Sequence, residues 1–155
     1  MIAISACLIG DNVRYDGSNK LNTELKSLVE QGKAISICPE VLGGLLTPRE
    51  AAEIVGGDGR DVWQGTAKVI TKTGEDVTES FKSGAQFALE ILKEQGCTGV
   101  ILKSKSPSCG WSEIYDGSFS GQLKQGKGVS AALFEQQGIT PVSYTHLTLP
   151  TTPYV

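Results

Sequence analysis

The sequence predicts a single α/β domain, a compact Rossmann-like parallel sheet whose strands are joined by crossover helices. A length of 155 residues suits one domain. The composition, 39% apolar and 20% charged, is typical of a globular chain and not of a disordered one. Short apolar segments alternate along the chain with segments of helical period, an order typical of parallel sheets with right-handed crossovers. We expect the domain to span residues 1–143.

Four short, apolar segments are predicted to be strands of this sheet. They lie at residues 2–6, 34–37, 100–103 and 139–143. Pro39 ends the second strand, since proline has no backbone N–H to donate to a ladder. Residues 67–71, followed by a Thr-Gly-Glu turn, are predicted to form a further strand in a small hairpin.

Three segments are predicted to be helices, at residues 20–31, 79–95 and 129–137. The first two have the period of amphipathic helices. A shorter helix over residues 47–54 is predicted because Thr47-Pro48-Arg49-Glu50 has the spacing of a capping box with proline at the first helical position. The glycine-containing segments 40–46 and 56–59 on either side of it are predicted to be loops.

The last segment, residues 144–155, differs from the rest of the chain. It reads YTHLTLPTTPYV, is rich in threonine and proline, and has neither a helical nor a strand period. We expect it to be a disordered or non-native tail and not part of the domain. Its His146 is the single histidine of the chain, which excludes a Ser-His-Asp site within the predicted fold.

Charge and hydropathy limit the compartment and the partners. The net charge is −3 with a pI near 5.2, which argues against the basic face of a general nucleic-acid binder. The chain has no apolar run of about 18 residues, so no membrane span is expected. The first residues lack the positive charge of a signal peptide. We therefore expect a cytoplasmic protein with reduced cysteines.

Three of the four cysteines follow predicted strands. Cys7 follows the first strand, Cys38 the second, and Cys109 lies six residues beyond the third. The carboxyl ends of parallel strands meet at one edge of a sheet, where ligands bind in open α/β folds, so these residues are expected to converge there. Cys97 lies between a helix and a strand, at the opposite edge, and is expected to pack in the core.

Three converging thiolates suit a soft metal or an iron–sulfur cluster. A structural zinc site would need a fourth ligand, and neither a histidine nor another cysteine is predicted at this edge. The same spacing also fits three small buried side chains, since free cysteine is commonly buried. Both interpretations stay open on spacing alone, because the chain has no CxxC pair.

Polar residues accompany two of these cysteines. Glu40 follows Cys38 by two residues, where it is either a general acid or base beside a cluster or a helix-cap or surface carboxylate. Three serines, at positions 104, 106 and 108, precede Cys109 together with two lysines. These serines either gather hydroxyl groups at the edge of the sheet or form an ordinary turn.

Several separated motifs follow one another in the order found in a known family. They are Ser5-Ala6-Cys7-Leu8-Ile9-Gly10, Arg14-Tyr15-Asp16-Gly17, Cys38-Pro39-Glu40 with Gly43-Gly44-Leu45 and Pro48-Arg49, Gly56-Gly57-Asp58-Gly59-Arg60-Asp61-Val62, Asp76-Val77-Thr78, Ser106-Pro107-Ser108-Cys109-Gly110 and Gly126-Lys127-Gly128-Val129. Over about residues 1–142 the chain thereby resembles the DUF523 family, which includes the thiouracil desulfidases.

The resemblance implies a Rossmann-like domain with an oxygen-sensitive [4Fe–4S] cluster on Cys7, Cys38 and Cys109. It also implies that Glu40 is the catalytic glutamate and that Ser106 is the catalytic serine, with Ser104 as the alternative. Many relatives have cysteine where this chain has valine, at position 13. Either that position is not a required ligand here, or this chain is impaired.

The activity implied by the resemblance is hydrolytic removal of sulfur from a thiolated pyrimidine, thiouracil or a thiouridine nucleotide, with release of sulfide. The expected partner is therefore a small thiolated nucleobase or nucleotide. Whole tRNA and membranes are not expected, and protein partners stay open. The alternative function is a non-enzymatic iron–sulfur protein, such as a redox sensor or carrier, and a third is a zinc-dependent hydrolase that uses the same thiolates.

Overall fold

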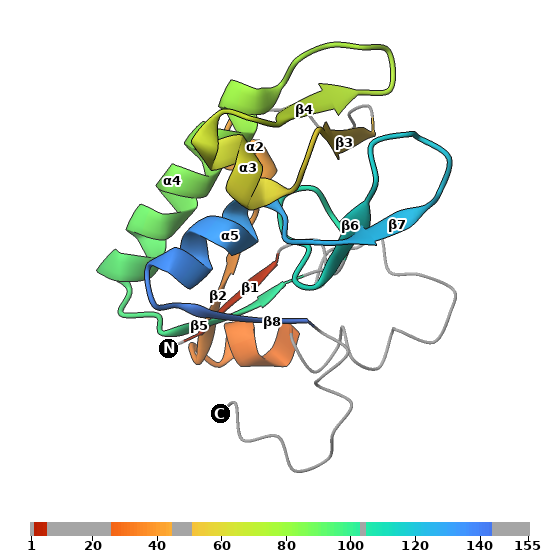
Figure 1. The fold of residues 1–155 in the computed structure, drawn as a ribbon. Coiled ribbons are helices and arrows are strands. Elements are labelled where there is room, and N and C mark those ends of the chain that lie inside the picture. Colours follow the sequence, from red (N-terminus) through yellow and green to blue (C-terminus); the bar gives the residue numbers. More distant parts are fainter. Residues whose placement is uncertain (1, 6–25, 45–50, 103–104, 144–155) are drawn as a thin grey trace.

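The computed structural model describes residues 2–5, 26–44, 51–102 and 105–143 (Figure 1). Its centre is a four-stranded parallel sheet in the order β2-β1-β5-β8. The strands are β1 (Ile2–Ser5), β2 (Ala34–Ile37), β5 (Gly99–Leu102) and β8 (Thr140–Ser143). The four predicted strands and the parallel α/β class are confirmed, and β1 lies inside the sheet between β2 and β5.

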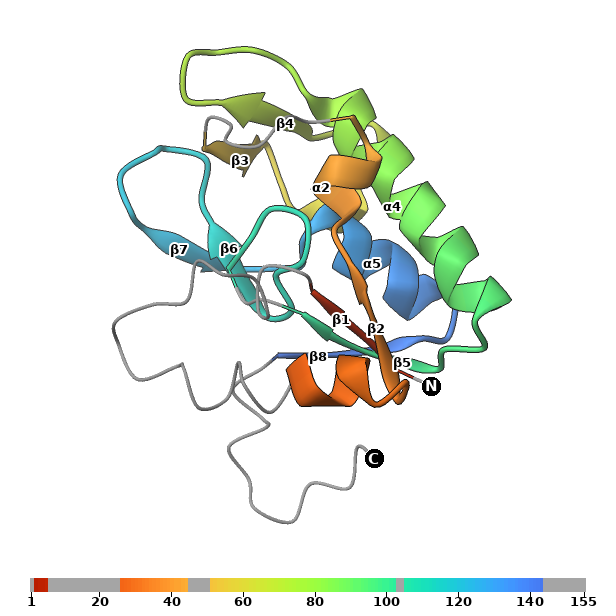
Figure 2. The ribbon, with the colours of Figure 1, turned by 180° about the vertical axis from the view of Figure 1, so that it is seen from behind.

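Different helices cover the two faces of this sheet. α4 (Thr78–Glu94) and α5 (Val129–Gln136) lie side by side on one face, and helical residues 26–30 cover the other (Figure 1 and Figure 2). Successive residues of β1 point to opposite faces, so Ala3 packs in the cluster beneath α4 and α5, and Ile4 in the cluster on the other face. Burial of both faces is typical of parallel sheets.

The helices α4 and α5 occupy segments that were predicted to be helical. α4 buries Phe81, Ala85, Ala88 and Leu92 along one stripe, at the spacing of an amphipathic helix. Gly96 follows α4 with a φ of 71°, a left-handed conformation that glycine adopts without steric cost. The helical residues 26–30 likewise lie within the first predicted helix.

The predicted short helix over residues 47–54 is wrong where the structure describes it. Ala52–Val55 forms the strand β3, which pairs antiparallel with β4 (Lys68–Thr71). Capping-box spacing is a local signal, whereas β3 is stabilised by a partner strand further along the chain, with Ile54 opposite Val69 and both side chains fully buried. β4 confirms the strand predicted at residues 67–71.

Four elements lie where loops, or no element, were predicted. They are α2 (Pro39–Leu42), α3 (Gly59–Gln64) and the antiparallel strands β6 (Glu113–Tyr115) and β7 (Leu123–Gln125). α3 begins with a capping box in which Asp58 accepts from the N–H of Asp61, and the Asp61 carboxylate accepts from the N–H of Asp58. The loop predictions for residues 40–46 and 56–59 are therefore wrong where α2 and α3 occur.

Some predicted features lie outside the described residues. These are Cys7, Val13, Ser104, His146 and the predicted tail, residues 144–155. Among the helices that the structure describes, none has the length and apolar character needed to cross a membrane.

Candidate active site at the carboxyl edge of the sheet

Cys38 lies at the carboxyl end of β2, as predicted. It is the N-cap of α2 and has an extended backbone, with φ −137° and ψ 95°. The last residue of β2, Ile37, is paired with Ser5, the last residue of β1, so these neighbouring strands end at the same edge. Cys7 follows Ser5 by two residues in the sequence and lies outside the described residues.

A close contact between α2 and α4 fixes the backbone around Cys38. A Cβ atom added to Gly84 would lie 1.8 Å from the carbonyl oxygen of Pro39, and one added to Gly43 would lie 2.0 Å from that of Ser80. The two helix backbones therefore touch at positions that admit no side chain. Glu40, half-buried in the first turn of α2, is held by the same contact.

The Ser106 hydroxyl organises the turn that carries Cys109. Its Oγ accepts hydrogen bonds from the N–H of Ser108 at 3.0 Å and of Cys109 at 3.1 Å. The Ser106 carbonyl also accepts from the N–H of Gly110 at 2.8 Å. The lone pairs of the hydroxyl are thus engaged by backbone donors, while its own O–H remains able to donate.

The Cys109 turn is bound to the N-terminus of α5. The carbonyl of Pro107 accepts from the N–H of Val129 at 2.7 Å, and the carbonyl of Ser108 accepts from Ser130 at 2.8 Å and Ala131 at 3.1 Å. These bonds satisfy N–H groups that have no partner within the helix. Because α5 runs back to the start of β8 through a short connection, its N-terminus lies at the carboxyl edge of the sheet.

Cys109 therefore lies at the same edge as Cys38. Its side chain is 4% exposed and belongs to the apolar cluster that also contains Ile37, the neighbour of Cys38. Within the described residues, no three His, Cys, Asp or Glu side chains form a group that could hold a metal ion. Convergence of Cys7 with the other two cysteines stays a prediction.

Two glycine-containing segments, residues 56–59 and 126–128, pack against each other beside the Cys109 turn. The N–H of Gly59 donates to the carbonyl of Lys127 at 2.7 Å, and the N–H of Lys127 donates to Asp58 Oδ2 at 3.2 Å. A Cβ atom added to Gly128 would lie 2.5 Å from backbone atoms of Ser108. α3, α5 and the Cys109 turn thus form one close-packed unit.

Replacing Asp58 with alanine should lower the free energy of unfolding by about 1 to 2 kcal/mol, because α3 loses its N-cap and Lys127 loses a partner. Urea unfolding followed by circular dichroism measures the change. The matched control is Asp116→Ala, since the Asp116 carboxylate accepts hydrogen bonds from Ser118, within the β6–β7 loop. Equal losses in the two variants would contradict this role of Asp58.

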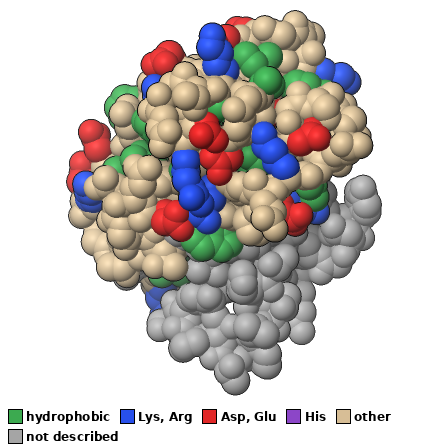
Figure 3. Space-filling model, viewed as in Figure 1, with side chains coloured by type: hydrophobic (Ala, Val, Ile, Leu, Met, Phe, Trp, Pro, Cys, Tyr) green, Lys and Arg blue, Asp and Glu red, His purple; other side chains and the backbone are tan. Residues whose placement is uncertain are grey.

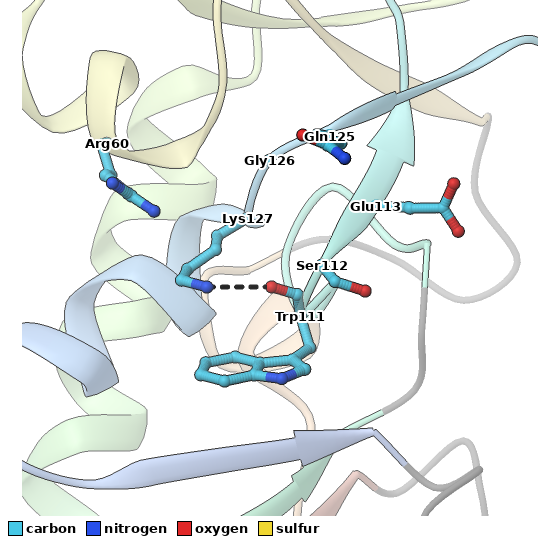
Figure 4. A pocket seen from close by; sticks show the side chains of 7 residues that line it. All are labelled: Arg60, Trp111, Ser112, Glu113, Gln125, Gly126 and Lys127. Atoms are coloured by element: carbon cyan, nitrogen blue, oxygen red, sulfur yellow. Dashed lines mark hydrogen bonds between the residues drawn. The ribbon is translucent and has the colours of Figure 1, made fainter.

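A polar pocket of about 480 Å³ lies beside the Cys109 turn (Figure 4). Arg60 extends toward it, whereas the Glu113 carboxylate points away.

Lys127 Nζ lies 3.8 Å from the centroid of the Trp111 ring, donates to the Trp111 carbonyl at 3.1 Å and lies 3.6 Å from a Glu135 carboxylate oxygen. Lys127 therefore holds the segment after Cys109 against α5.

Cys97 is separate from this site, as predicted. It lies between α4 and β5, at the opposite edge of the sheet, and is 6% exposed in the core. Burial raises the pKa of its thiol, which favours the uncharged form.

Sequence reasoning missed several residues that shape the site. Gly84 and Ser130 carried no pattern that distinguished them from other helical residues, because their roles come from contacts with distant segments. Lys127 lies in the Gly126–Val129 motif, but its ring contact with Trp111 is visible only in the structure.

On the face shown in Figure 3, acidic and basic side chains of the described residues are interspersed.

The fold and the candidate site together define a class of protein. It is a single α/β domain with cysteine, glutamate and serine residues at the carboxyl edge of a parallel sheet. A family model described as 2-thiouracil desulfurase matches residues 2–145. The chain belongs to this family, and the resemblance drawn from its motifs is confirmed.

Two similar proteins cover nearly the whole chain. The uncharacterized protein YbbK of Bacillus subtilis (strain 168) is 50% identical over 147 residues, which are 95% of this chain and 97% of that protein. Among solved structures, the [4Fe–4S]-dependent thiouracil desulfidase TudS matches with a TM-score of 0.77 and 36% identity, over 95% of this chain and 92% of that one. The match confirms the predicted fold.

Proposed function

We propose that this protein is a [4Fe–4S]-dependent desulfidase, which hydrolytically removes sulfur from a thiolated pyrimidine and releases sulfide. Membership of the 2-thiouracil desulfurase family and the similarity to TudS support the reaction class. The observation that carries the proposal is the position of Cys38 and Cys109 at one edge of the sheet, on the segments that follow β2 and β5, the two strands that flank β1.

We assign the cluster to Cys7, Cys38 and Cys109. Cys38 and Cys109 suit an iron–sulfur cluster, because thiolates are its usual protein ligands and backbone contacts hold both residues in place. Cys97 is left out of the set because it lies in the core at the opposite edge. When bound, a cluster with three protein ligands supplies a Lewis-acidic iron for the sulfur of the substrate.

Glu40 moves the protons of the reaction in this proposal. Hydrolysis of a thiocarbonyl consumes one water, converts C=S to C=O and releases H₂S, with no net transfer of electrons. The Glu40 carboxylate takes a proton from the attacking water and returns it to the ring nitrogen or the leaving sulfur. Its half-buried position at the start of α2, two residues from Cys38, supports this role.

Ser106 orients the substrate or the attacking oxygen by donating its O–H. Two backbone N–H groups already occupy the lone pairs of its oxygen, so the hydroxyl serves as a donor and not as a base. Ser104 remains the alternative. The substrate is a small thiolated nucleobase or nucleotide and not whole tRNA, since the chain is acidic. An oxygen-sensitive cluster fits the reducing cytoplasm.

Anaerobic reconstitution tests the proposal. We expect about four iron and four acid-labile sulfide per chain, and sulfide release when 2-thiouracil or 4-thiouracil is added. A loaded cluster without sulfide release from either base or its nucleotide would favour the non-enzymatic iron–sulfur protein. Zinc without labile sulfide would favour the hydrolase. Either result would contradict the proposed activity.

Replacing Cys97 with alanine should leave the iron content and the turnover unchanged, because this thiol is not in the proposed ligand set. The free energy of unfolding should fall by about 1 kcal/mol, since a buried side chain is shortened in the core. Iron analysis and urea unfolding measure the two effects. The matched control is Cys38→Ala, which should lose iron. Iron loss in the Cys97 variant would contradict the ligand assignment.

A further inference from the structure

Two serines form a buried hydroxyl pair next to the sulfur of Cys109. Ser108 is 1% exposed and Ser130 is fully buried, and their Oγ atoms lie 2.8 Å apart. The Cys109 thiol donates to Ser108 Oγ with a sulfur–oxygen distance of 3.8 Å. A continuous chain of hydrogen bonds thus runs from α5 through the turn to the sulfur.

The backbone holds this pair in place. The carbonyl of Ser108 accepts from the N–H groups of Ser130 and Ala131, so the two serines are joined by main-chain as well as side-chain bonds. Gly128 packs directly on the Ser108 backbone. The hydroxyl groups therefore stay at fixed positions, and the freedom that remains is the direction in which each O–H points.

We propose that Ser130 and Ser108 are positioning residues that donate a hydrogen bond to the Cys109 sulfur when it is a cluster ligand. This inference rests on the proposed function. A ligand thiolate has lost its proton, so Ser108 Oγ no longer receives the S–H bond. The Ser108 hydroxyl is then the donor to the sulfur, and Ser130 supplies its own O–H to Ser108. Each hydroxyl donates once, and the pair needs no additional group.

Such a hydrogen bond tunes the electronic state of a cluster. Hydrogen bonds to the sulfur ligands are among the factors that set the reduction potential of iron–sulfur centres. A donor bond draws electron density from the thiolate, and in a water-poor site each member of the chain strengthens the next. The pair should raise the reduction potential and make the cluster harder to oxidise in air.

The experiment compares reconstituted wild type with Ser130→Ala, which removes the outer hydroxyl without touching the sulfur, and with Ser130→Thr, which keeps it. Redox titration followed by electron paramagnetic resonance gives the potential, and iron analysis gives the loading. We expect a more negative potential and faster cluster loss in air for S130A, with S130T close to wild type. The matched control is Ser120→Ala, because Ser120 forms an exposed hydroxyl pair with Ser118. It should change neither the reduction potential nor the rate of cluster loss in air.

The possible results separate this inference from the function on which it rests. A fully loaded S130A protein with the wild-type potential and air stability would overturn the inference alone. A shift in S130A that S130T shares would also overturn it, because the effect would then not depend on the hydroxyl. A wild-type chain that takes up no iron would overturn the proposed function instead. Ser108→Ala should shift the potential at least as far as S130A.

Discussion

Replacing Glu40 with glutamine is expected to leave the cluster loaded and to slow sulfide release by about 10²- to 10⁴-fold, the range associated with the loss of a general acid or base. Glutamine keeps the size and polarity of the side chain but cannot exchange a proton near neutral pH. Because Glu40 contributes no ligand in the proposed set, iron and labile sulfide should match wild type. The measurement is the initial rate of sulfide release from thiouracil under anaerobic conditions.

Glu79→Gln is the matched control for this variant. Glu79 also lies in the first turn of a helix, but its side chain is 86% exposed on α4. Its replacement should leave turnover unchanged. Full activity in the Glu40 variant would exclude this carboxylate from the chemistry, and iron loss would show that its role is structural.

The second large effect is expected for Gly84→Ala on α4. A Cβ atom at this position would lie 1.8 Å from the carbonyl oxygen of Pro39, so α2 must move away from α4. We expect the free energy of unfolding to fall by about 3 kcal/mol, at the upper end of the range for overpacked cores. Since Cys38 and Glu40 are carried by the displaced segment, iron uptake should fall as well. Urea unfolding and iron analysis measure these effects.

Gly99→Ala provides the matched control on β5. An added Cβ atom there would meet its nearest neighbours at 3.9 Å, and the residue does not have a positive φ. Its stability and iron uptake should stay close to wild type. If Gly84→Ala also keeps the stability and iron content of wild type, the α2–α4 contact does not position the site.

The Glu40 and Gly84 variants distinguish the loss of a reactive side chain from the loss of the packing that positions the site. The Glu40 variant should lose turnover with little change in unfolding, because a half-buried carboxylate is replaced by a side chain of the same shape. The Gly84 variant should lose stability and turnover together, although Gly84 carries no functional group. This difference would show that the site depends on a rigid platform of α2, α4 and α5 as much as on its reactive side chains.

Local patterns in the sequence were sufficient to predict the central parallel sheet and its helices. The four strands are short apolar runs and α4 has a clear helical period, so each of these segments favours its own conformation. Parallel order then assigns Cys38 and Cys109 to one edge, which the structure confirms. The same reasoning assigns Cys7 to that edge as a prediction, and it correctly left Cys97 in the core.

Tertiary structure decided the features that depend on distant partners. Ala52–Val55 is a strand because β4 pairs with it, and the capping-box spacing before it did not reveal that partner. The Ser108–Ser130 pair joins residues 22 apart, and the Gly84 contact joins α4 to the chain around Pro39. Periodicity and capping depend on neighbours within a few residues, whereas close packing and buried hydrogen bonds depend on which segments meet in space. The sequence alone therefore predicted the sheet and the edge that carries the thiols, and only folding created the supports that hold them.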